Sequence, residues 1–166
     1  MQTCVAILIF AVMSCAQRVD AQSPSPPNSV NTWDIVVRIN QERGKVGLPL
    51  LSIDNRLIAV ADAKNKDMVD HEYIAHVSTS GVDLKMLLTK LGYAHTYMEV
   101  GENLALGDFT SSDDVMDSFM ASPDHRSNIL DKNYSVVGIS VQKRNYHGIQ
   151  TWYVVQEFGR LRTVAP

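Results

Sequence analysis

The stretch SPDHRSNIL, Ser122–Leu130, brings together a set of side chains that could form either a turn or a functional site. A proline, two charged residues, a histidine and an asparagine fall within residues 123–128, and two aliphatic residues follow them. Proline and small polar residues of this kind favour a tight turn, in which a histidine can simply cap backbone groups. The role of His125 therefore depends on what the rest of the chain places beside it.

Helical patterns precede this stretch and strand patterns follow it. Apolar residues at helical spacing predict helices over residues 33–43, 54–70, 83–92 and 111–121. In the second of these, Lys64–Asp67 would form the solvated face. Residues 98–109 fit a short strand or an irregular buried segment. Residues 134–142 and 151–158 predict an antiparallel hairpin, so the fold class is α+β, with helices packed on a small antiparallel sheet.

The N-terminal segment is typical of a signal peptide. An apolar run from Cys4 to about Ala16 is too short to span a bilayer and is followed by small residues. We expect a signal peptide over residues 1–21, with cleavage after Ala21, or alternatively after Ala16. Lipid attachment at Cys15 is a further interpretation of the same segment. The expected organisation is completed by a linker over residues 22–30, a domain over 31–160 and a tail over 161–166.

The cysteine positions and the charge balance restrict how the chain is stabilised and which partners it can bind. Both cysteines, Cys4 and Cys15, lie in the predicted signal peptide, so the mature chain must be held together by its core, without disulfides. With 15 basic and 18 acidic residues the chain has no excess of positive charge, which argues against nucleic acid as a partner.

Three ionisable residues stand out as candidates for chemistry. His76 and His125 each follow a predicted helix among small and polar residues, and Glu102 lies in the apolar run VGENLAL. A buried carboxylate needs a hydrogen-bonding or charged partner, and a histidine can provide one. The three could hold a divalent metal such as zinc, with His76 and His125 as ligands, or could form a polar cluster without metal. The sequence has no G-x-S-x-G motif, and the predicted mature chain has no cysteine to act as a nucleophile. The sequence therefore gives no support for covalent catalysis.

Several longer segments also match a known family in order and spacing. They are INQERGKVGLPLLSIDNRLIAVADAKNKDM (39–68), GYAHTYMEVGENLALG (92–107), FMASPDHRSNIL (119–130), YSVVGISV (134–141) and YVVQEFG (153–159). In this order the chain resembles the CAP superfamily, which groups cysteine-rich secretory proteins, antigen five and pathogenesis-related proteins of group one. It is most similar to the disulfide-poor SCP-like branch common in bacteria.

The resemblance implies a three-layer α-β-α sandwich with a central antiparallel sheet and a cleft lined by two histidines and two acids. His76, Glu102 and His125 match three of these four positions, and zinc is implied at the two histidines. Where the family has the second glutamate, this chain has Ser122, so a divalent cation would be held less tightly. Glu157 could supply the missing carboxylate only by facing the cleft. Since Gln156 matches the family's glutamine, alternation along a strand predicts that Glu157 points away.

Two functions remain open from the sequence. One is an extracellular binding protein for a sterol, a lipid or another extracellular ligand, in defence or in host–microbe interaction. The alternative is a metal-assisted hydrolase or protease in which His76, Glu102 and His125 activate water. Whether the chain is an enzyme is therefore left open, and binding is the preferred interpretation.

Overall fold

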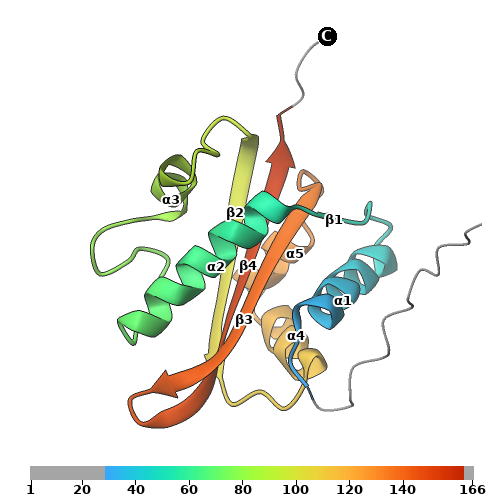
Figure 1. Cartoon of the computed structure of the whole chain (residues 1–166). Helices are drawn as coiled ribbons and strands as arrows, with labels where there is room; N and C mark the ends of the chain where they lie inside the picture. Colours follow the sequence, from blue (N-terminus) through green and yellow to red (C-terminus); the bar gives the residue numbers. More distant parts are fainter. Residues whose placement is uncertain (1–28, 163–166) are drawn as a thin grey trace, which may run out of the picture.

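The computed structural model describes residues 29–162. It contains a four-stranded sheet with helices on both faces (Figure 1). The predicted signal peptide, residues 22–28 of the predicted linker and residues 163–166 of the predicted tail lie outside the described residues. No helix within residues 29–162 is long and apolar enough to cross a membrane. The elements in chain order are α1 Thr32–Lys45, β1 Ser52–Ile53, α2 Asn55–Asp70, α3 Leu84–Lys90, β2 Tyr97–Gly107, α4 Ser112–Ala121, α5 Pro123–Ile129, β3 Val136–Tyr146 and β4 Ile149–Leu161.

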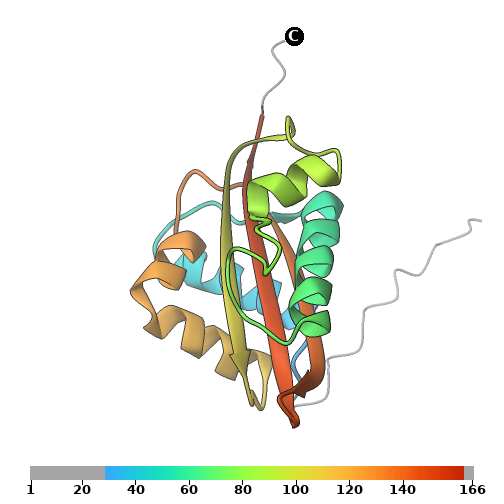
Figure 2. The same cartoon turned by 90° about the vertical axis from the view of Figure 1, so that its left-hand side faces the viewer.

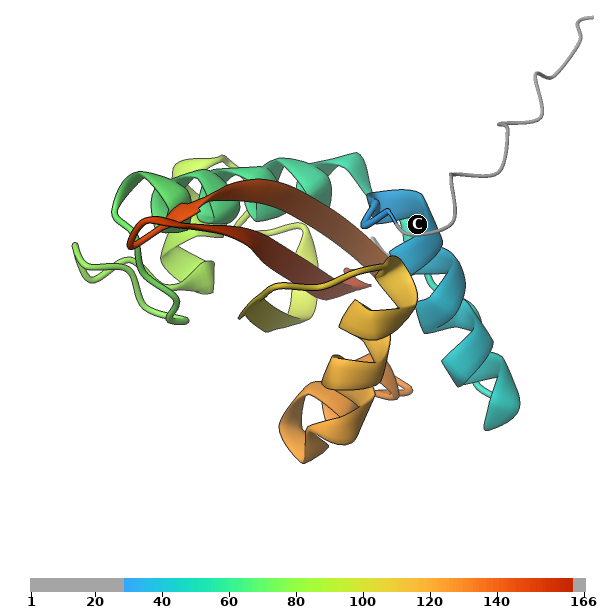
Figure 3. The same cartoon turned by 90° about the horizontal axis from the view of Figure 1, so that it is seen from below.

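The sheet has the strand order β1-β3-β4-β2. β2, β4 and β3 are antiparallel, whereas the two-residue β1 pairs parallel with the start of β3. α2 and α3 cover one face, and α1, α4 and α5 cover the other (Figures 2 and 3). This arrangement confirms the predicted three-layer α-β-α fold and leaves β2 at one edge of the sheet, between the two helical layers.

The helix starts follow from short polar side chains at the N-caps. Asn31, Asp54, Asp83 and Ser111 each accept a hydrogen bond from a backbone N–H in the first turn of α1, α2, α3 and α4. Such bonds satisfy N–H groups that have no partner within the helix. All four helices therefore begin within one residue of the predicted starts.

The predicted turn at Ser122–Leu130 is instead a short helix, α5, which follows α4 directly. Pro123 occupies the start of α5, where its fixed φ suits a helix and its missing N–H costs no hydrogen bond. Ser122 separates α4 from α5 in an extended conformation. The turn prediction was wrong because proline can begin a helix as well as interrupt one.

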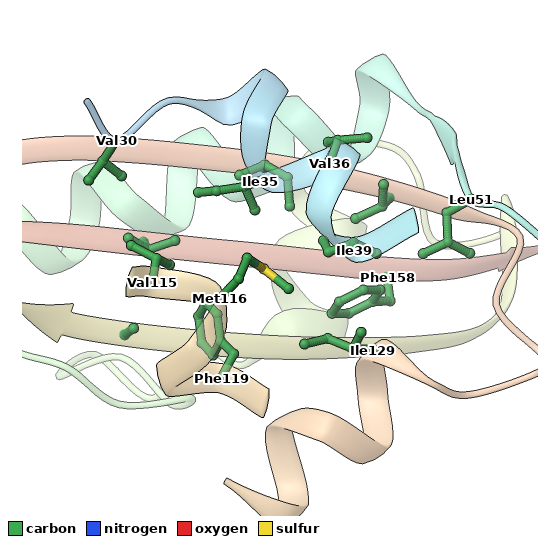
Figure 4. Packing of buried hydrophobic residues seen from close by; sticks show 14 of the residues in the cluster. Val30, Ile35, Val36, Ile39, Leu51, Val115, Met116, Phe119, Ile129 and Phe158 are labelled. Carbon is green, nitrogen blue, oxygen red and sulfur yellow. The ribbon is translucent and has the colours of Figure 1, made fainter. Parts of the chain in front are cut away.

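The largest apolar cluster lies between the sheet and the layer of α1, α4 and α5 (Figure 4). Ile35 and Ile39 of α1, Met116 and Phe119 of α4 and Phe158 of β4 are all fully buried there. Two smaller clusters pack beneath α2 and α3 on the opposite face. Burial on both faces fits the apolar run Trp152–Val155 in the middle of β4.

Arg43 is a buried cation that ties α1 to the segment after α5. Its guanidinium donates to the carbonyl oxygens of Pro49 at 2.8 Å, Ile129 at 2.9 Å, Asp131 at 2.8 Å and Tyr134 at 3.3 Å. Burial lowers the pKa of Arg43, partly offset by the charge of Asp131. The planar, five-donor guanidinium suits this role because it can serve several carbonyls at once. Arg43 thereby fixes the path of the chain from α5 to β3.

Gly138 permits a close contact between α2 and the sheet. A Cβ added at Gly138 would lie 2.2 Å from the backbone carbon of Leu57 and 2.3 Å from the nitrogen of Ile58. We expect Gly138→Ala to lower the free energy of unfolding by about 3 kcal/mol or more, because backbone atoms of α2 would have to move. Gly44→Ala is the control, since nothing lies within 4 Å of an added Cβ there. Equal denaturation midpoints for the two variants would contradict the prediction.

Candidate functional site

The predicted site residues gather along β2, the edge strand where the two helical layers meet. The segment of residues 71–83, which follows α2, lies on one side of β2, and α5 lies on the other (Figure 2). His76 comes from the first of these segments, Glu102 from β2 and His125 from α5. Three segments that are far apart in sequence therefore supply the candidate residues.

His76 and Glu102 form a hydrogen-bonded pair, as the sequence predicted for a buried glutamate. His76 Nδ1 lies 2.7 Å from Glu102 Oε1. The Glu102 side chain is buried, whereas that of His76 is 64% exposed. Because a carboxylate only accepts hydrogen bonds, this contact places a hydrogen on Nδ1 and, in the neutral ring, the lone pair on Nε2. Nε2 is therefore the nitrogen of His76 that can accept a proton or bind a cation.

Lys64 holds the backbone that carries His76. Its ammonium donates to the carbonyl oxygens of Ala75 at 2.6 Å and His76 at 3.0 Å, and it lies 5.5 Å from the centre of the Tyr73 ring. Lys64 and its neighbour Asn65 are buried, so the prediction that they belong to a solvated helix face was wrong. A buried lysine must have hydrogen-bonding partners, and here these are the carbonyls of the site segment.

His125 is less exposed than His76 and differs from it electrostatically. Its ring meets Phe119 edge to face, with 5.1 Å between ring centres. Burial lowers the pKa of His125, the positive charge of a protonated His76 lowers it further, and Asp124 acts in the opposite direction. A charge on His76 therefore disfavours a second charge on His125. His125 favours the neutral form, which retains a lone pair.

Amides brace the α5 side of the site. Asn128 Nδ2 donates to Asn103 Oδ1 at 2.8 Å and to the carbonyl of Glu102 at 3.2 Å. Asn103 Nδ2 in turn donates to the carbonyl of His125 and to Gln156 Oε1, both at 3.0 Å. Asn128 thus connects α5 to β2. The contribution of Asn103 was not identified from the sequence.

Glu157 faces Glu102, which corrects the expectation that it would point away. The two residues are directly opposite in the β2–β4 register, and Glu157 is completely buried. Burial raises the pKa of Glu157 well above its usual range, and the charge of Glu102 and hydrogen bonding to it raise the pKa further, while Lys64 acts in the opposite sense. The alternation rule itself holds, because Gln156 faces the α4 layer, where its amide contacts Met116 Sδ at 3.4 Å. The error lay in assuming that one face of β4 supplies the whole site.

Ser122 lies at the junction of α4 and α5. Its N–H donates to the carbonyl of Phe119, and its carbonyl accepts from the N–H of Arg126. Its hydroxyl makes no capping hydrogen bond to α5. The match between Ser122 and the position of the family's second glutamate remains a prediction.

The donor set for a metal consists of two imidazoles. Neutral nitrogens of His76 and His125 suit zinc, and the bond from His76 Nδ1 to Glu102 is the kind of carboxylate–histidine contact that orients a zinc ligand. Within residues 29–162, no three His, Cys, Asp or Glu side chains form a metal-binding group. A cation held by His76 and His125 therefore stays a prediction.

Two adjoining hollows follow the exposed side of β2. The larger has a volume of about 430 Å³ and lies between α3, β2 and Tyr134. The smaller, of about 290 Å³, is lined by both His76 and Glu102. Lys85 and Val100 line both hollows, so the hollows share a wall. The lining residues of the larger hollow are Lys85, Leu88, Thr89, Ala94, Tyr97, Met98, Glu99, Val100 and Tyr134.

Gly101 lets Tyr134 approach the backbone between these hollows. A Cβ at Gly101 would lie 2.4 Å from Tyr134 Oη and 3.1 Å from Asn128 Oδ1. Any larger residue would push the Tyr134 ring out of its position beside β2. The glycine of the sequence GEN therefore has a packing role next to Glu102.

Comparison with known proteins identifies the family. Residues 36–158 match the model of the CAP, or cysteine-rich secretory protein, family. This match covers most of the chain, and the protein belongs to that family.

Two curated relatives come from Bacillus subtilis (strain 168). The uncharacterized protein YkwD is 37% identical over 118 residues, which are 69% of this chain and 44% of YkwD. The uncharacterized membrane protein YlbC is 29% identical over 108 residues, which are 64% of this chain and 30% of YlbC. The chain thus spans less than half the length of either relative.

Solved structures support the same fold. An extracellular protein from Bacillus anthracis that contains an SCP domain has a TM-score of 0.67 and 26% identity, over 77% of this chain and 39% of that one. An outer surface protein from Borrelia burgdorferi has a TM-score of 0.69 and 22% identity, over 78% of this chain and 92% of that one.

The raised pKa of Glu157 predicts how stability depends on pH. Below about pH 4 the side chain is protonated in both the folded and the unfolded chain. As the pH rises, the unfolded chain loses this proton while the folded chain keeps it, so the wild type loses stability from this group. Glu157→Gln has no such proton to lose. We expect its free energy of unfolding, relative to wild type, to rise by about 1.4 kcal/mol per pH unit until the folded-state pKa is reached.

Denaturant unfolding of both proteins between pH 4 and 8 measures this difference. The part of the difference that is the same at every pH reports the amide substitution itself, and the part that grows with pH reports the raised pKa of Glu157. A difference that does not change with pH would contradict a protonated Glu157.

Proposed function

We propose that the protein is an extracellular binding protein for an amphipathic ligand of the sterol or lipid class. The observation that carries this proposal is the 430 Å³ hollow beside β2, which adjoins the hollow lined by His76 and Glu102. Ligand sites are commonly hollows of about 300–1,000 Å³ with apolar walls and a few polar groups. Here the apolar body of the ligand would lie against Leu88, Val100 and Tyr134. Its polar group would face His76.

The residues that line the two hollows support a site with one apolar part and one polar part. Leu88, Tyr97 and Tyr134 contribute buried apolar surface on one side of the larger hollow. His76 Nε2 can bind a hydroxyl or carboxylate group, while Lys85 reaches both hollows. A ligand with one polar end and one apolar end would use both kinds of wall.

An extracellular location is part of the proposal. Its support is the predicted signal peptide over residues 1–21 together with relatives described as an extracellular protein and an outer surface protein. A role in defence or in contact between a host and a microbe would follow from such a location.

Met98 offers a direct test, because it lines the larger hollow and is 51% exposed. We expect Met98→Glu to weaken binding of a fluorescent sterol or fatty acid about tenfold or more, because the ligand would have to cover a charge. Met86→Glu is the matched control, since Met86 is 52% exposed on α3 and does not line the hollow. Fluorescence titration of folded variants gives the affinities. Equal affinities for the two variants, or no binding by the wild type, would overturn the proposal.

Glu102→Gln separates binding from catalysis in the same titration. Glutamine can still accept the hydrogen bond from His76 Nδ1, so probe affinity should change by less than about threefold. A hydrolase that relies on the carboxylate would instead lose roughly a hundredfold in rate.

A metal-assisted hydrolase is the second candidate, favoured by the 2.7 Å contact between His76 and Glu102. A histidine held by a carboxylate is suited to accept a proton from water. Zinc bound by His76 and His125 would supply Lewis-acid polarisation. The open positions of a two-histidine site would leave room for water and substrate.

Zinc titration of the purified protein tests this second candidate. We expect binding that His76→Ala combined with His125→Ala abolishes, because both proposed ligands are then missing. His147→Ala is the control, since its side chain is 65% exposed, close to the 64% of His76, and it lies in the hairpin turn. Zinc binding that persists in the double variant would exclude this metal site.

A further inference from the structure

We propose that Glu157 is a positioning residue for His76, acting as a neutral carboxylic acid that donates a hydrogen bond to Glu102 and so holds the carboxylate that orients the imidazole. The inference deepens the proposed function, because it rests on His76 being the polar group of the binding site. Glu157 lies in β4 and does not line the hollows. It also matches none of the site positions that the family resemblance implies.

The strand register brings the two carboxyl groups together. Glu102 and Glu157 are directly opposite across β2 and β4, and opposite residues point to the same face of a sheet. Both side chains are buried. The two groups are thus enclosed side by side beneath the segment that carries His76.

Three buried carboxyl oxygens lack a donor from elsewhere in the described chain. Glu102 Oε1 receives the hydrogen bond from His76, but Glu102 Oε2 and both oxygens of Glu157 accept from no N–H or hydroxyl group of residues 29–162. Leaving buried carboxylate oxygens without donors is costly. A proton on Glu157 solves this for the pair, because its O–H can donate to Glu102 Oε2.

The charges around Glu157 favour a single proton on the pair. Glu102 faces it from β2 and Lys64 faces it from α2. Its partner in β3 is Gly138, which contributes no side chain. If Glu157 is neutral, the charges of Lys64 and Glu102 balance. If Glu157 is ionised, the buried group carries an unpaired negative charge.

The result is a chain of hydrogen bonds from Glu157 through Glu102 to His76. A hydrogen bond between a carboxylic acid and a carboxylate is charge-assisted and therefore strong. It would fix Glu102 with Oε1 toward His76 Nδ1, which keeps the hydrogen on Nδ1 and the lone pair on Nε2. Lys64 fixes the backbone of His76 by donating to its carbonyl oxygen. The imidazole is then held from both its ring and its main chain.

The test measures the tautomer of His76 by nitrogen NMR of the labelled protein at about pH 8, above the usual titration range of histidine. In the wild type and in Glu157→Gln we expect His76 to carry its hydrogen on Nδ1, because a side-chain amide also donates to Glu102. In Glu157→Leu the ratio of the Nδ1–H form to the Nε2–H form should fall about tenfold, as expected for the loss of one buried charge-assisted hydrogen bond. Val155→Ala is the control, since it weakens the same face of β4 without touching the carboxyl pair.

Each outcome bears on Glu157 alone. An unchanged ratio in folded Glu157→Leu, or an equal fall in Glu157→Gln and Glu157→Leu, would overturn the proposal. If Glu157→Leu does not fold, the carboxyl carbon shift of Glu157 in the wild type at neutral pH decides, since an ionised carboxylate would overturn it as well. None of these measurements requires a bound ligand or metal, so failure of the binding proposal would leave the result intact.

Discussion

The register between β2 and β4 is the constraint on which the rest of the site depends. It places Glu102 opposite Glu157 and, one residue further, Asn103 opposite Gln156. Because neighbouring residues of a strand point to opposite faces, the glutamates serve the α2 layer and the amides serve the α4 and α5 layer. A slip of one residue would exchange these faces and leave His76 without its carboxylate.

Two buried cations, one on α1 and one on α2, hold irregular segments beside this sheet. Arg43 donates to carbonyls at the end of α5 and in the segment after it, and Lys64 donates to the carbonyls of Ala75 and His76. In a chain expected to lack disulfides after signal cleavage, such bonds hold segments that have few apolar side chains. They cost desolvation, but each donor satisfies carbonyls that would otherwise be buried without partners. The edge of the sheet can therefore carry polar side chains in defined positions.

Much of this arrangement could be predicted from the sequence, and the failures have a common cause. The caps Asn31, Asp54, Asp83 and Ser111 act locally, so their effect is visible in a few adjacent residues. The pairing of Glu102 with a histidine followed from the cost of burying a carboxylate. Lys64 and Glu157 were misjudged because their partners lie outside their own helix or strand. A polar residue at a fully buried position looks the same in sequence as one at a solvated position.

The two histidines of the site are chemically unequal, and this inequality bears on the kind of ligand that the site suits. His76 is largely exposed and paired with a carboxylate, whereas burial and the charge of His76 keep His125 in its neutral form. A tight metal centre would gain from several converging anionic or imidazole ligands. An exposed imidazole, held in one tautomer at the border of an apolar hollow, instead offers one directed polar contact. One such contact can fix the orientation of a ligand whose affinity comes from apolar burial, and this is the physical basis of the binding proposal.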